Sequence, residues 1–239
     1  MTASVAPSPA ASPDVSPDAS ANTSSNATCA DAVFPPLASA PTPTGGWAWL
    51  QPYVRPAFIR LNRWFMIPVH RAGLGAWLAT PVMGYMLLLR VRGRKSGLVR
   101  EIPLSYLVAE GSAWVLAGFG ETTEWYRNLL VDPHVEVVLP GRQLAAIADV
   151  VPDPAARARI MPPLVRATGL VGFTIGVNPW TAGDEAILAV LDWIPLVRLT
   201  PESGPIAPGA DDPGGRAWIW RQGLLLGLWL LARRLLRRG

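Results

Sequence analysis

Side chains that bind metals or react covalently are scarce in this 239-residue chain. It has a single cysteine, Cys29, and only two histidines, His70 and His134. One cysteine cannot form an internal disulfide, and no cluster of residues has metal-ligand spacing. Cys29 lies in a polar tail and is a poor candidate for a nucleophile, and we expect a structural role for each histidine. We therefore predict a protein with no metal site and no internal disulfide, in which the sequence identifies no catalytic residue.

Lysine is nearly absent as well, and the excess positive charge is small. Lys95 is the only lysine, and the formal net charge is +4. Nucleic-acid-binding domains concentrate basic residues on one face, so we expect no nucleic-acid partner. What the chain has in abundance is apolar surface, since 50% of its residues are hydrophobic and 11 are tryptophan. Tryptophan in such number is typical of proteins that bind flat ligands, form interfaces or lie at a membrane boundary.

The N-terminal part of the chain differs from the rest in composition. Residues 1–44 are rich in Ala, Ser, Pro and Thr and contain no basic side chain. Such a segment buries too little apolar surface to offset the entropy of ordering it, so we predict disorder. It also lacks the apolar stretch of a secretory signal. We expect one folded domain over residues 45–200, followed by a linker of Pro, Gly and Asp residues over 201–216.

Residues 217–239 are predicted to form a separate helix. On a helical wheel one arc carries Leu224, Leu225, Leu228, Leu231, Ala232, Leu235 and Leu236, and the opposite side carries Arg233, Arg234, Arg237 and Arg238. The uninterrupted apolar run over 223–232 is too short to span a bilayer. We predict a helix that lies on a membrane surface, with an oligomerisation helix as the alternative. The expected location is the cytoplasm, at the inner face of the cell membrane; the oligomeric state stays open.

Within residues 45–200, short apolar segments alternate with turns. The patterns predict strands over 82–91, 102–108, 112–117, 134–139, 144–151 and 194–200. They predict helices over 56–67, from Thr122 or Thr123 to Leu130 and over 184–191. A further helix is predicted from Pro154 through Arg157, Arg159 and Arg166, bent or broken at Pro162 and Pro163. The helix over 56–67 either covers the core or forms a lip over a ligand pocket or on a membrane. Residues 168–183 are expected to be irregular. The uncharged segment 72–89 approaches the length of a membrane span, but Pro81 and its glycines favour a loop before a buried strand.

The most informative motif lies within residues 93–139. Gly93-Arg94-Lys95-Ser96-Gly97 is a basic turn flanked by glycines, which let a backbone approach a ligand closely. Arginine pairs with phosphate through two hydrogen bonds, and lysine adds a point charge. A merely solvated basic turn is the alternative. A glycine-broken strand end at 118–120 and an aromatic helix around Trp125 follow, and they favour a site for a flat heterocycle that carries a phosphate.

Together these motifs resemble the deazaflavin-dependent nitroreductases, also called F420H2-dependent quinone reductases. The resemblance extends from roughly Leu61 to Pro201. It rests on the basic turn at 93–97, Arg100, Pro103-Leu104, Trp125-Tyr126-Arg127-Asn128-Leu129, Asp132-Pro133 and the closing segment 194–201. It implies an α+β fold, a split β-barrel of the flavin-reductase type with flanking helices, and coenzyme F420 as the hydride donor.

The resemblance also implies the residues of a cofactor site. Arg94, Lys95 and Arg100 would hold the phosphate and acidic tail, and Pro103 and Leu104 would line the ring system. The backbone of Ala117, Gly118 and Phe119 would face the edge of the ring, and Trp125 and Asn128 would close the pocket. The chain departs from the family pattern at Phe119 and Gly120, where related proteins often carry a lysine and more glycine, with a longer loop before the tryptophan.

From this resemblance we expect an oxidoreductase that passes a hydride from reduced F420 to a quinone or a nitro-aromatic acceptor. The cofactor supplies the reactivity, so the chemistry needs no catalytic triad or acid pair. Tyr85, Tyr106 and Tyr126 are candidate proton donors, and nothing in the sequence selects one. Two alternatives stay open: the same barrel with FMN as cofactor, and a non-catalytic membrane-associated protein that binds a flat lipophilic ligand.

Overall fold

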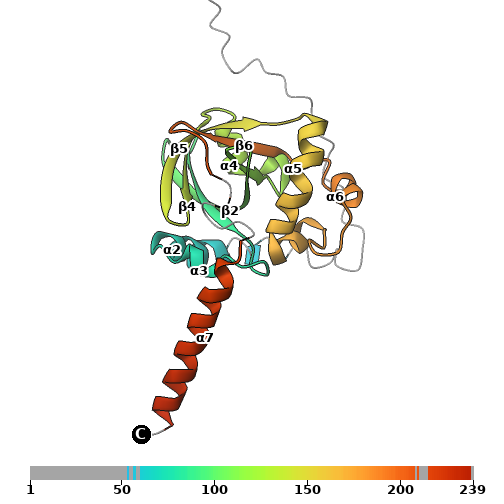
Figure 1. Ribbon diagram of the computed structural model, residues 1–239. Coiled ribbons are helices and arrows are strands. Elements are labelled where there is room, and N and C mark those ends of the chain that lie inside the picture. The colour runs from blue at the N-terminus through green and yellow to red at the C-terminus, as the bar shows by residue number, and fades with distance from the viewer. Residues whose placement is uncertain (1–52, 54–55, 58–59, 208, 210–214, 238–239) are drawn as a thin grey trace, which may run out of the picture. The chain divides into compact units, whose positions relative to one another are not determined.

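The computed structural model describes residues 53, 56–57, 60–207, 209 and 215–237 (Figure 1). All of them belong to the second of two units into which the chain divides, Phe34–Gly239. The tail predicted over residues 1–44, including Cys29, lies outside the described residues.

Six antiparallel strands close into a barrel in the order β1-β2-β3-β6-β5-β4. They are β1 (Met86–Arg92), β2 (Val99–Ala109), β3 (Ser112–Leu116), β4 (His134–Leu139), β5 (Arg142–Val150) and β6 (Leu196–Pro201). The pairs β1–β2, β2–β3 and β4–β5 are hairpins, whereas β5 pairs with β6 across the helices that lie between them in the sequence. The pairings of β1 with β4 and of β3 with β6 close the ring. The barrel and its flanking helices confirm the predicted α+β split-barrel class.

The strands form where the apolar alternation predicted them, with small shifts at their ends. Val135, Val137 and Leu139 of β4 are buried while their neighbours are half-buried or exposed, as expected for a strand with one face in a core. β1 starts at Met86 rather than at residue 82, because Gly84 turns the chain with a φ of +85°. β2 is longer than predicted and begins at Val99.

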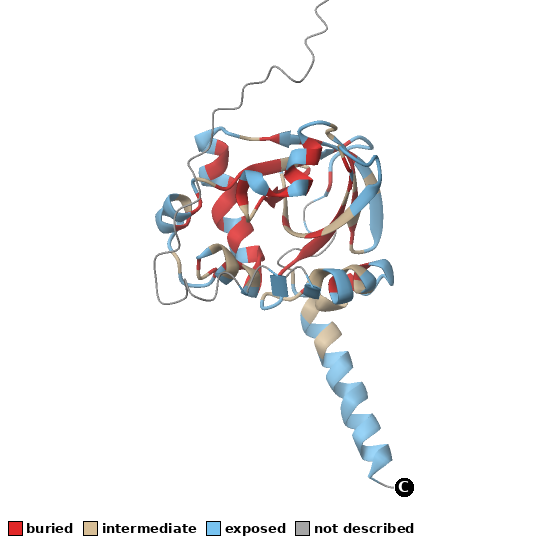
Figure 2. Ribbon diagram, turned by 180° about the vertical axis from the view of Figure 1, so that it is seen from behind, coloured by how far each residue is buried: buried red, intermediate tan, exposed pale blue. Residues whose placement is uncertain are grey.

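Two apolar cores hold the fold together (Figure 2). The first fills the barrel and includes Leu87, Tyr106 and Val137. The second lies between the outer side of β3, where Trp114 is buried, and the helices that follow β5. The outer core is therefore what fixes those helices on the barrel.

Several helices flank the barrel. The bounds are η3 (Asn62–Met66, a π-helical turn), α2 (Ile67–Arg71), α3 (Gly75–Leu78), η4 (Gly120–Thr122), α4 (Glu124–Leu129), α5 (Pro154–Ala167), η5 (Gly169–Ile175), α6 (Asp184–Val190) and α7 (Ala217–Leu236). The segment 72–89 forms α3, a loop and β1, as favoured over a membrane span. Among the described residues no helix is long and apolar enough to cross a bilayer.

Helix α5 confirms its predicted cap and excludes one of the two effects expected of its prolines. Asp153 caps it as predicted, since its carboxylate accepts hydrogen bonds from the backbone N–H of Ala155 at 3.4 Å and of Ala156 at 2.9 Å. The helix runs through Arg166 to Ala167, as predicted, and of the two effects expected of Pro162 and Pro163, a bend or a break, the break does not occur. The prolines remove backbone hydrogen bonds, but burial of the apolar face of α5 in the outer core offsets that loss.

Candidate functional site

A cavity of about 350 Å³ lies beside β2. Its volume falls within the range of small-molecule sites, roughly 300–1,000 Å³. It is lined by Asn62, Met86, Arg100, Ile102, Pro103, Leu104, Ser105, Leu116, Gly118, Phe119, Thr123, Glu124, Trp125, Asn128, Thr168, Val171, Thr174 and Ile175. Most of these side chains are apolar, so the cavity suits a ligand with a large flat apolar part.

Strand β2 gives the cavity two different ends. Arg100 stands at one end, opposite Val91 of β1, and the nearby helix α4 adds Glu124 and Asn128. Ser105 stands at the other end, opposite Met86, and Asn62 of η3 joins it there. The rise along a strand separates the two ends by roughly 17 Å. We call the first the charged end and the second the apolar end.

The structure brings most of the predicted cofactor residues to this cavity. Among its lining residues are Arg100, Pro103, Leu104, Gly118, Phe119, Trp125 and Asn128. Arg94, Lys95 and Ala117 do not line it. Lys95 is exposed in the turn before β2, on the same side of the barrel as the charged end.

Arg94 is already bound to other residues of the protein. Its guanidinium donates from Nη1 to Glu124 Oε2 at 2.7 Å and to Asn128 Oδ1 at 2.9 Å. Its backbone N–H also donates to Asn128 Oδ1, at 3.2 Å. The hydrogen bond from Arg94 is the main reason that the pKa of Glu124 lies below its ordinary value. Arg94 therefore ties the basic turn to α4, and a phosphate would have to compete with these partners.

The backbone of Ala117 is likewise used by the fold. Its N–H donates to the Pro195 carbonyl at 3.0 Å, and its own carbonyl accepts from the Gly120 N–H at 2.6 Å. Gly120 has a φ of +70°, and a Cβ there would lie 2.8 Å from Cζ3 of Trp193. Close packing of Trp193 therefore explains the glycine at this departure from the family pattern. Ala117 shapes the loop, and Gly118 and Phe119 present it to the cavity.

The wall missed by the sequence interpretation is η5. Residues 168–183 were expected to be irregular, yet Gly169–Ile175 forms a helix whose Val171, Thr174 and Ile175 line the cavity. The Leu170 N–H donates to the Val82 carbonyl at 2.8 Å, which fixes this helix beside the loop before β1. In the sequence the glycines were the only notable feature of this segment, and they favoured an irregular structure rather than a helix.

Two glycines make that close contact possible. Gly84 and Gly169 have φ values of +85° and +56°. A Cβ at Gly84 would lie 2.3 Å from the Thr168 carbonyl oxygen, and one at Gly169 would lie 2.3 Å from the Val82 carbonyl oxygen. Only glycine lets the two backbones approach this closely. The pair therefore determines where η5 sits over the cavity.

The apolar end holds two polar atoms that lack a partner. Among the described residues, Asn62 Oδ1 and Ser105 Oγ are buried without a hydrogen bond. A buried polar atom left unpaired costs about 1–3 kcal/mol. Both atoms belong to lining residues, so a ligand with a polar edge could satisfy both at once.

The candidate proton donors and the histidines lie away from the cavity. Tyr85, Tyr106 and Tyr126 are all buried in the barrel core, and none is a lining residue. Burial raises the pKa of Tyr126 to about 12, which makes it a poor acid. The ring nitrogens of His70 lie 2.9 Å from the Met66 carbonyl oxygen and 3.3 Å from that of Met86. These contacts agree with the structural role expected for His70.

The donor set of the cavity fits coenzyme F420. The apolar stretch of β2 around Pro103 and Leu104 suits a flat ring system, and the unpaired Asn62 and Ser105 atoms suit its polar edge. Arg100, exposed at the charged end, suits an anionic tail. No lining side chain is arranged as a general acid and base pair. The arrangement can bind and orient a reactive cofactor rather than perform acid–base chemistry itself.

Comparisons with known proteins agree with the resemblance drawn from the motifs. The family model described as F420H(2)-dependent quinone reductase matches residues 67–169, which confirms that resemblance. No curated protein matches the chain.

Three of the solved structures that this chain resembles are distant from it in sequence. The conserved hypothetical protein Rv2991 from Mycobacterium tuberculosis is 16% identical over 55% of this chain and 79% of its own, with a TM-score of 0.39. The heme storage protein HutZ from Vibrio cholerae is 16% identical over 52% of this chain and 87% of its own, with a TM-score of 0.37. An F420-H2 dependent reductase, FDR-A, is 20% identical over 48% of this chain and 92% of its own, with a TM-score of 0.33.

Proposed function

We propose that the chain is an oxidoreductase, from the premise that its residues 67–169 match the model of the F420H(2)-dependent quinone reductase family. Its reductant is reduced coenzyme F420, and its acceptor is a quinone or a nitro-aromatic compound. The observation that carries the proposal is the two-ended cavity along β2. One end offers positive charge for an anionic tail, and the other offers an apolar slot with two unpaired polar atoms.

Each part of the cavity has a task in this proposal. Arg100 pairs with the phosphate of the cofactor tail, and Lys95 adds positive charge beside it. Pro103 and Leu104 pack against the ring, while Asn62 and Ser105 hydrogen-bond its polar edge. Arg94 acts indirectly, because it holds Asn128 and the basic turn in place.

The walls keep water away from the reacting face. When bound, reduced F420 supplies a hydride, and the protein supplies orientation and a dry pocket. Leu116 and Ile175 form apolar walls of the cavity, and Trp125, only 8% exposed, closes it beside α4. Proton delivery to the reduced acceptor falls to solvent, since the barrel tyrosines do not line the cavity.

A coenzyme titration tests the proposal. The purified chain is titrated with F420 and, separately, with FMN, and binding is followed by fluorescence. Binding of F420 without FMN is the expected result. Binding of FMN alone would replace the cofactor while keeping the barrel, and binding of neither would contradict an enzymatic role. Steady-state oxidation of F420H2 with a menaquinone and with a nitro-aromatic compound then identifies the acceptor.

A further inference from the structure

Between residues 223 and 232, helix α7 exposes apolar side chains on every side. None of its 20 residues is buried, and Figure 2 shows it exposed along almost its whole length. Leu228, Trp229 and Leu231 are each more than half exposed. A helix that is apolar nearly all round is stable in water only when something covers it. The described part of the chain covers only its first turns.

The charges of α7 indicate what covers it. Residues 215–237 contain no acidic side chain, and Arg233 and Arg234 stand in the last turn of the helix. The Arg233 guanidinium lies 5.3 Å from the centre of the Trp229 ring. Tryptophan and arginine side by side on a leucine-rich helix are typical of a helix that lies at the interface of a bilayer.

The start of α7 is held against α3. Arg221 Nη1 donates to the Ala76 carbonyl at 2.9 Å, and Gln222 Nε2 donates to the Trp77 carbonyl at 3.0 Å. The Trp77 and Trp220 rings meet edge to face, with their centres 6.3 Å apart. α7 is therefore attached at a defined place and does not hang from a free linker.

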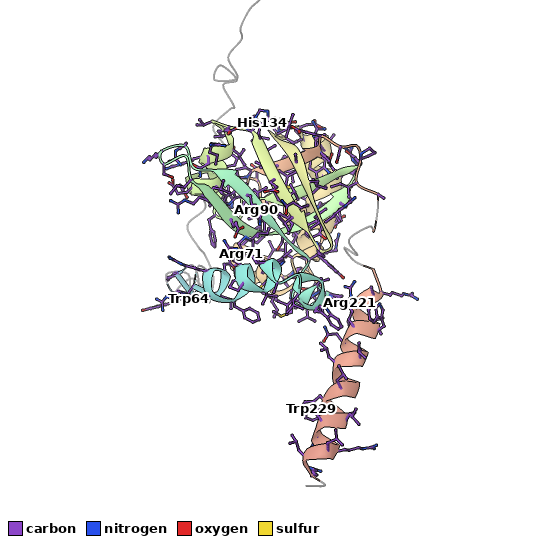
Figure 3. All side chains as sticks on the ribbon, turned by 90° about the vertical axis from the view of Figure 1, so that its left-hand side faces the viewer. Trp64, Arg71, Arg90, His134, Arg221 and Trp229 are labelled. Carbon is purple, nitrogen blue, oxygen red and sulfur yellow. The ribbon has the colours of Figure 1, made fainter. Side chains whose placement is uncertain are left out.

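That place is surrounded by more exposed apolar side chains. We define the apolar face as Trp64, Phe65, Val82, Met83, Leu170 and Phe173, which are 41–77% exposed. Trp64 and Phe65 lie on η3, which contacts α2, and α2 in turn contacts α3. The Leu170 N–H donates a hydrogen bond to the Val82 carbonyl, which links the other part of the face. In Figure 3, Trp64, Arg221 and Trp229 lie toward one end of the protein and His134 lies at the other.

The apolar face and the cavity are two sides of the same elements. η3 contributes Asn62 to the cavity and Phe65 to the apolar face, and η5 contributes Val171 to the cavity and Phe173 to the face.

We propose that α7 and the apolar face together bind the surface of a bilayer that contains anionic phospholipid. The arginines of α7 pair with lipid phosphates, and the leucines and tryptophans enter the headgroup region. A second copy of the chain would cover α7 less well than a bilayer, because the α7 of that copy offers no carboxylate to neutralise these arginines. If the proposed function holds, the apolar end of the cavity then faces lipid, and a lipid-soluble acceptor reaches it without crossing water.

Vesicle co-sedimentation tests the proposal with the full chain. One set of vesicles is phosphatidylcholine alone, and the other contains about one third phosphatidylglycerol. We expect clear binding to the second set and at least a tenfold loss of it in the triple variant Arg233→Glu, Arg234→Glu, Arg237→Glu, which keeps the chain length and the leucines. Absence of binding to the anionic vesicles, or equal binding by this variant, overturns the proposal.

A matched pair of variants tests the apolar face. Trp64→Ser with Phe65→Ser is expected to weaken vesicle binding several-fold. Val131→Ser is the control, since Val131 is 67% exposed but close in sequence to His134, at the other end of the barrel. An equal loss in both variants would overturn the role of the face. A dimer in sedimentation equilibrium that is lost on removing residues 217–239, without vesicle binding, would assign α7 to a second copy instead.

The readouts separate this proposal from the proposed function. Vesicle binding needs no cofactor. If the protein binds vesicles but not F420, the membrane proposal is supported and the proposed function is contradicted. A chain without residues 217–239 that still binds F420 but no longer binds vesicles supports both. Turnover that is equally fast with lipid-embedded and soluble acceptors, in both forms, would contradict delivery from the bilayer.

Discussion

The charged and apolar ends of the cavity are built in different ways. The charged end comes from one stretch of sequence, in which Arg94 and Arg100 flank the turn and Asn128 follows on α4. The apolar end joins Asn62 to Ser105 and to η5, which lie far apart in the sequence. Local chemistry specifies the first end, while backbone contacts between remote segments specify the second.

This difference predicts how substitutions at each end affect ligand affinity and protein stability. At the charged end the side chains of Arg94, Arg100 and Glu124 are exposed or partly exposed, so substitutions of these residues should change affinity more than stability. The apolar end depends on backbones in contact, so substitutions there should disturb the fold first. The predictions below test this contrast, from the largest expected effect to the smallest.

Gly169→Ala should have the largest effect, at the apolar end. Its positive φ and a Cβ 2.3 Å from the Val82 carbonyl oxygen force η5 away from the loop before β1. We expect a loss of about 3–5 kcal/mol in the free energy of unfolding, measured by urea denaturation. Gly97→Ala is the control, since Gly97 also has a positive φ but no atom within 4 Å of the added Cβ. It should cost only about 1–2 kcal/mol, and equal losses would contradict the role given to the backbone contact.

Arg100→Ala and Arg94→Ala should separate binding from bracing at the charged end. Arg100→Ala is expected to weaken F420 binding by about 10- to 100-fold and to leave stability nearly unchanged. Arg94→Ala should cost about 1 kcal/mol of stability through its lost bonds to Asn128 and Glu124 and have a smaller effect on affinity. Isothermal titration and urea denaturation of both variants check this split. The reverse pattern would assign the phosphate to Arg94.

Ser105→Ala tests the unpaired hydroxyl at the apolar end. The free protein should be as stable as before or up to about 1 kcal/mol more stable, because a buried polar atom without a partner is removed. Affinity for F420 should fall by roughly 2- to 10-fold, because the ligand loses one hydrogen bond. Titration and urea denaturation again give the two values. Unchanged affinity would mean that the ring edge does not reach Ser105.

The smallest effect is the pH dependence that Glu124 contributes. Arg94 lowers the pKa of Glu124 below its ordinary value of 4.5 in the folded state. Between the folded and unfolded pKa values the unfolded chain binds more protons, so stability rises with pH through that window. The contribution is present above pH about 4.5 and is lost as the pH falls through the folded pKa. An NMR titration of the Glu124 carboxyl should show the low pKa in the wild type and its return toward 4.5 in Arg94→Ala.

Most of the barrel could be predicted because its strands alternate one residue in and one residue out. β4 has the predicted bounds, His134–Leu139, since its alternation is regular and Pro133 and Pro140 flank it. β1 was predicted to begin too early, because residues 82 and 83 are apolar like a strand yet lie exposed before the turn at Gly84. Apolar composition alone does not distinguish a buried strand from an exposed loop.

The wall formed by η5 could not be predicted for a related reason. Residues 169–175 carry glycine and threonine among apolar side chains and no regular period. Their helix is held by backbone contacts to residues 82–84, about 85 positions earlier, and a pattern within one segment contains no trace of such contacts. A break of α5 at Pro162 and Pro163 was one of two open expectations for the same reason, since the burial that sustains the helix comes from other elements.

The sequence by itself determined the antiparallel strands, the arginine and lysine of the basic turn, and the leucine and arginine pattern of α7. These depend on alternation, glycine placement and charge, which are properties of neighbouring residues. Only the tertiary structure decided that Arg94 is tied to α4 while Arg100 lines the cavity, and that Asn62 and Ser105 keep unpaired atoms at its apolar end. It also decided that α7 starts beside α3, next to the apolar face. Closing a ring of strands brings distant residues together, and the distances between them follow from packing rather than from local sequence.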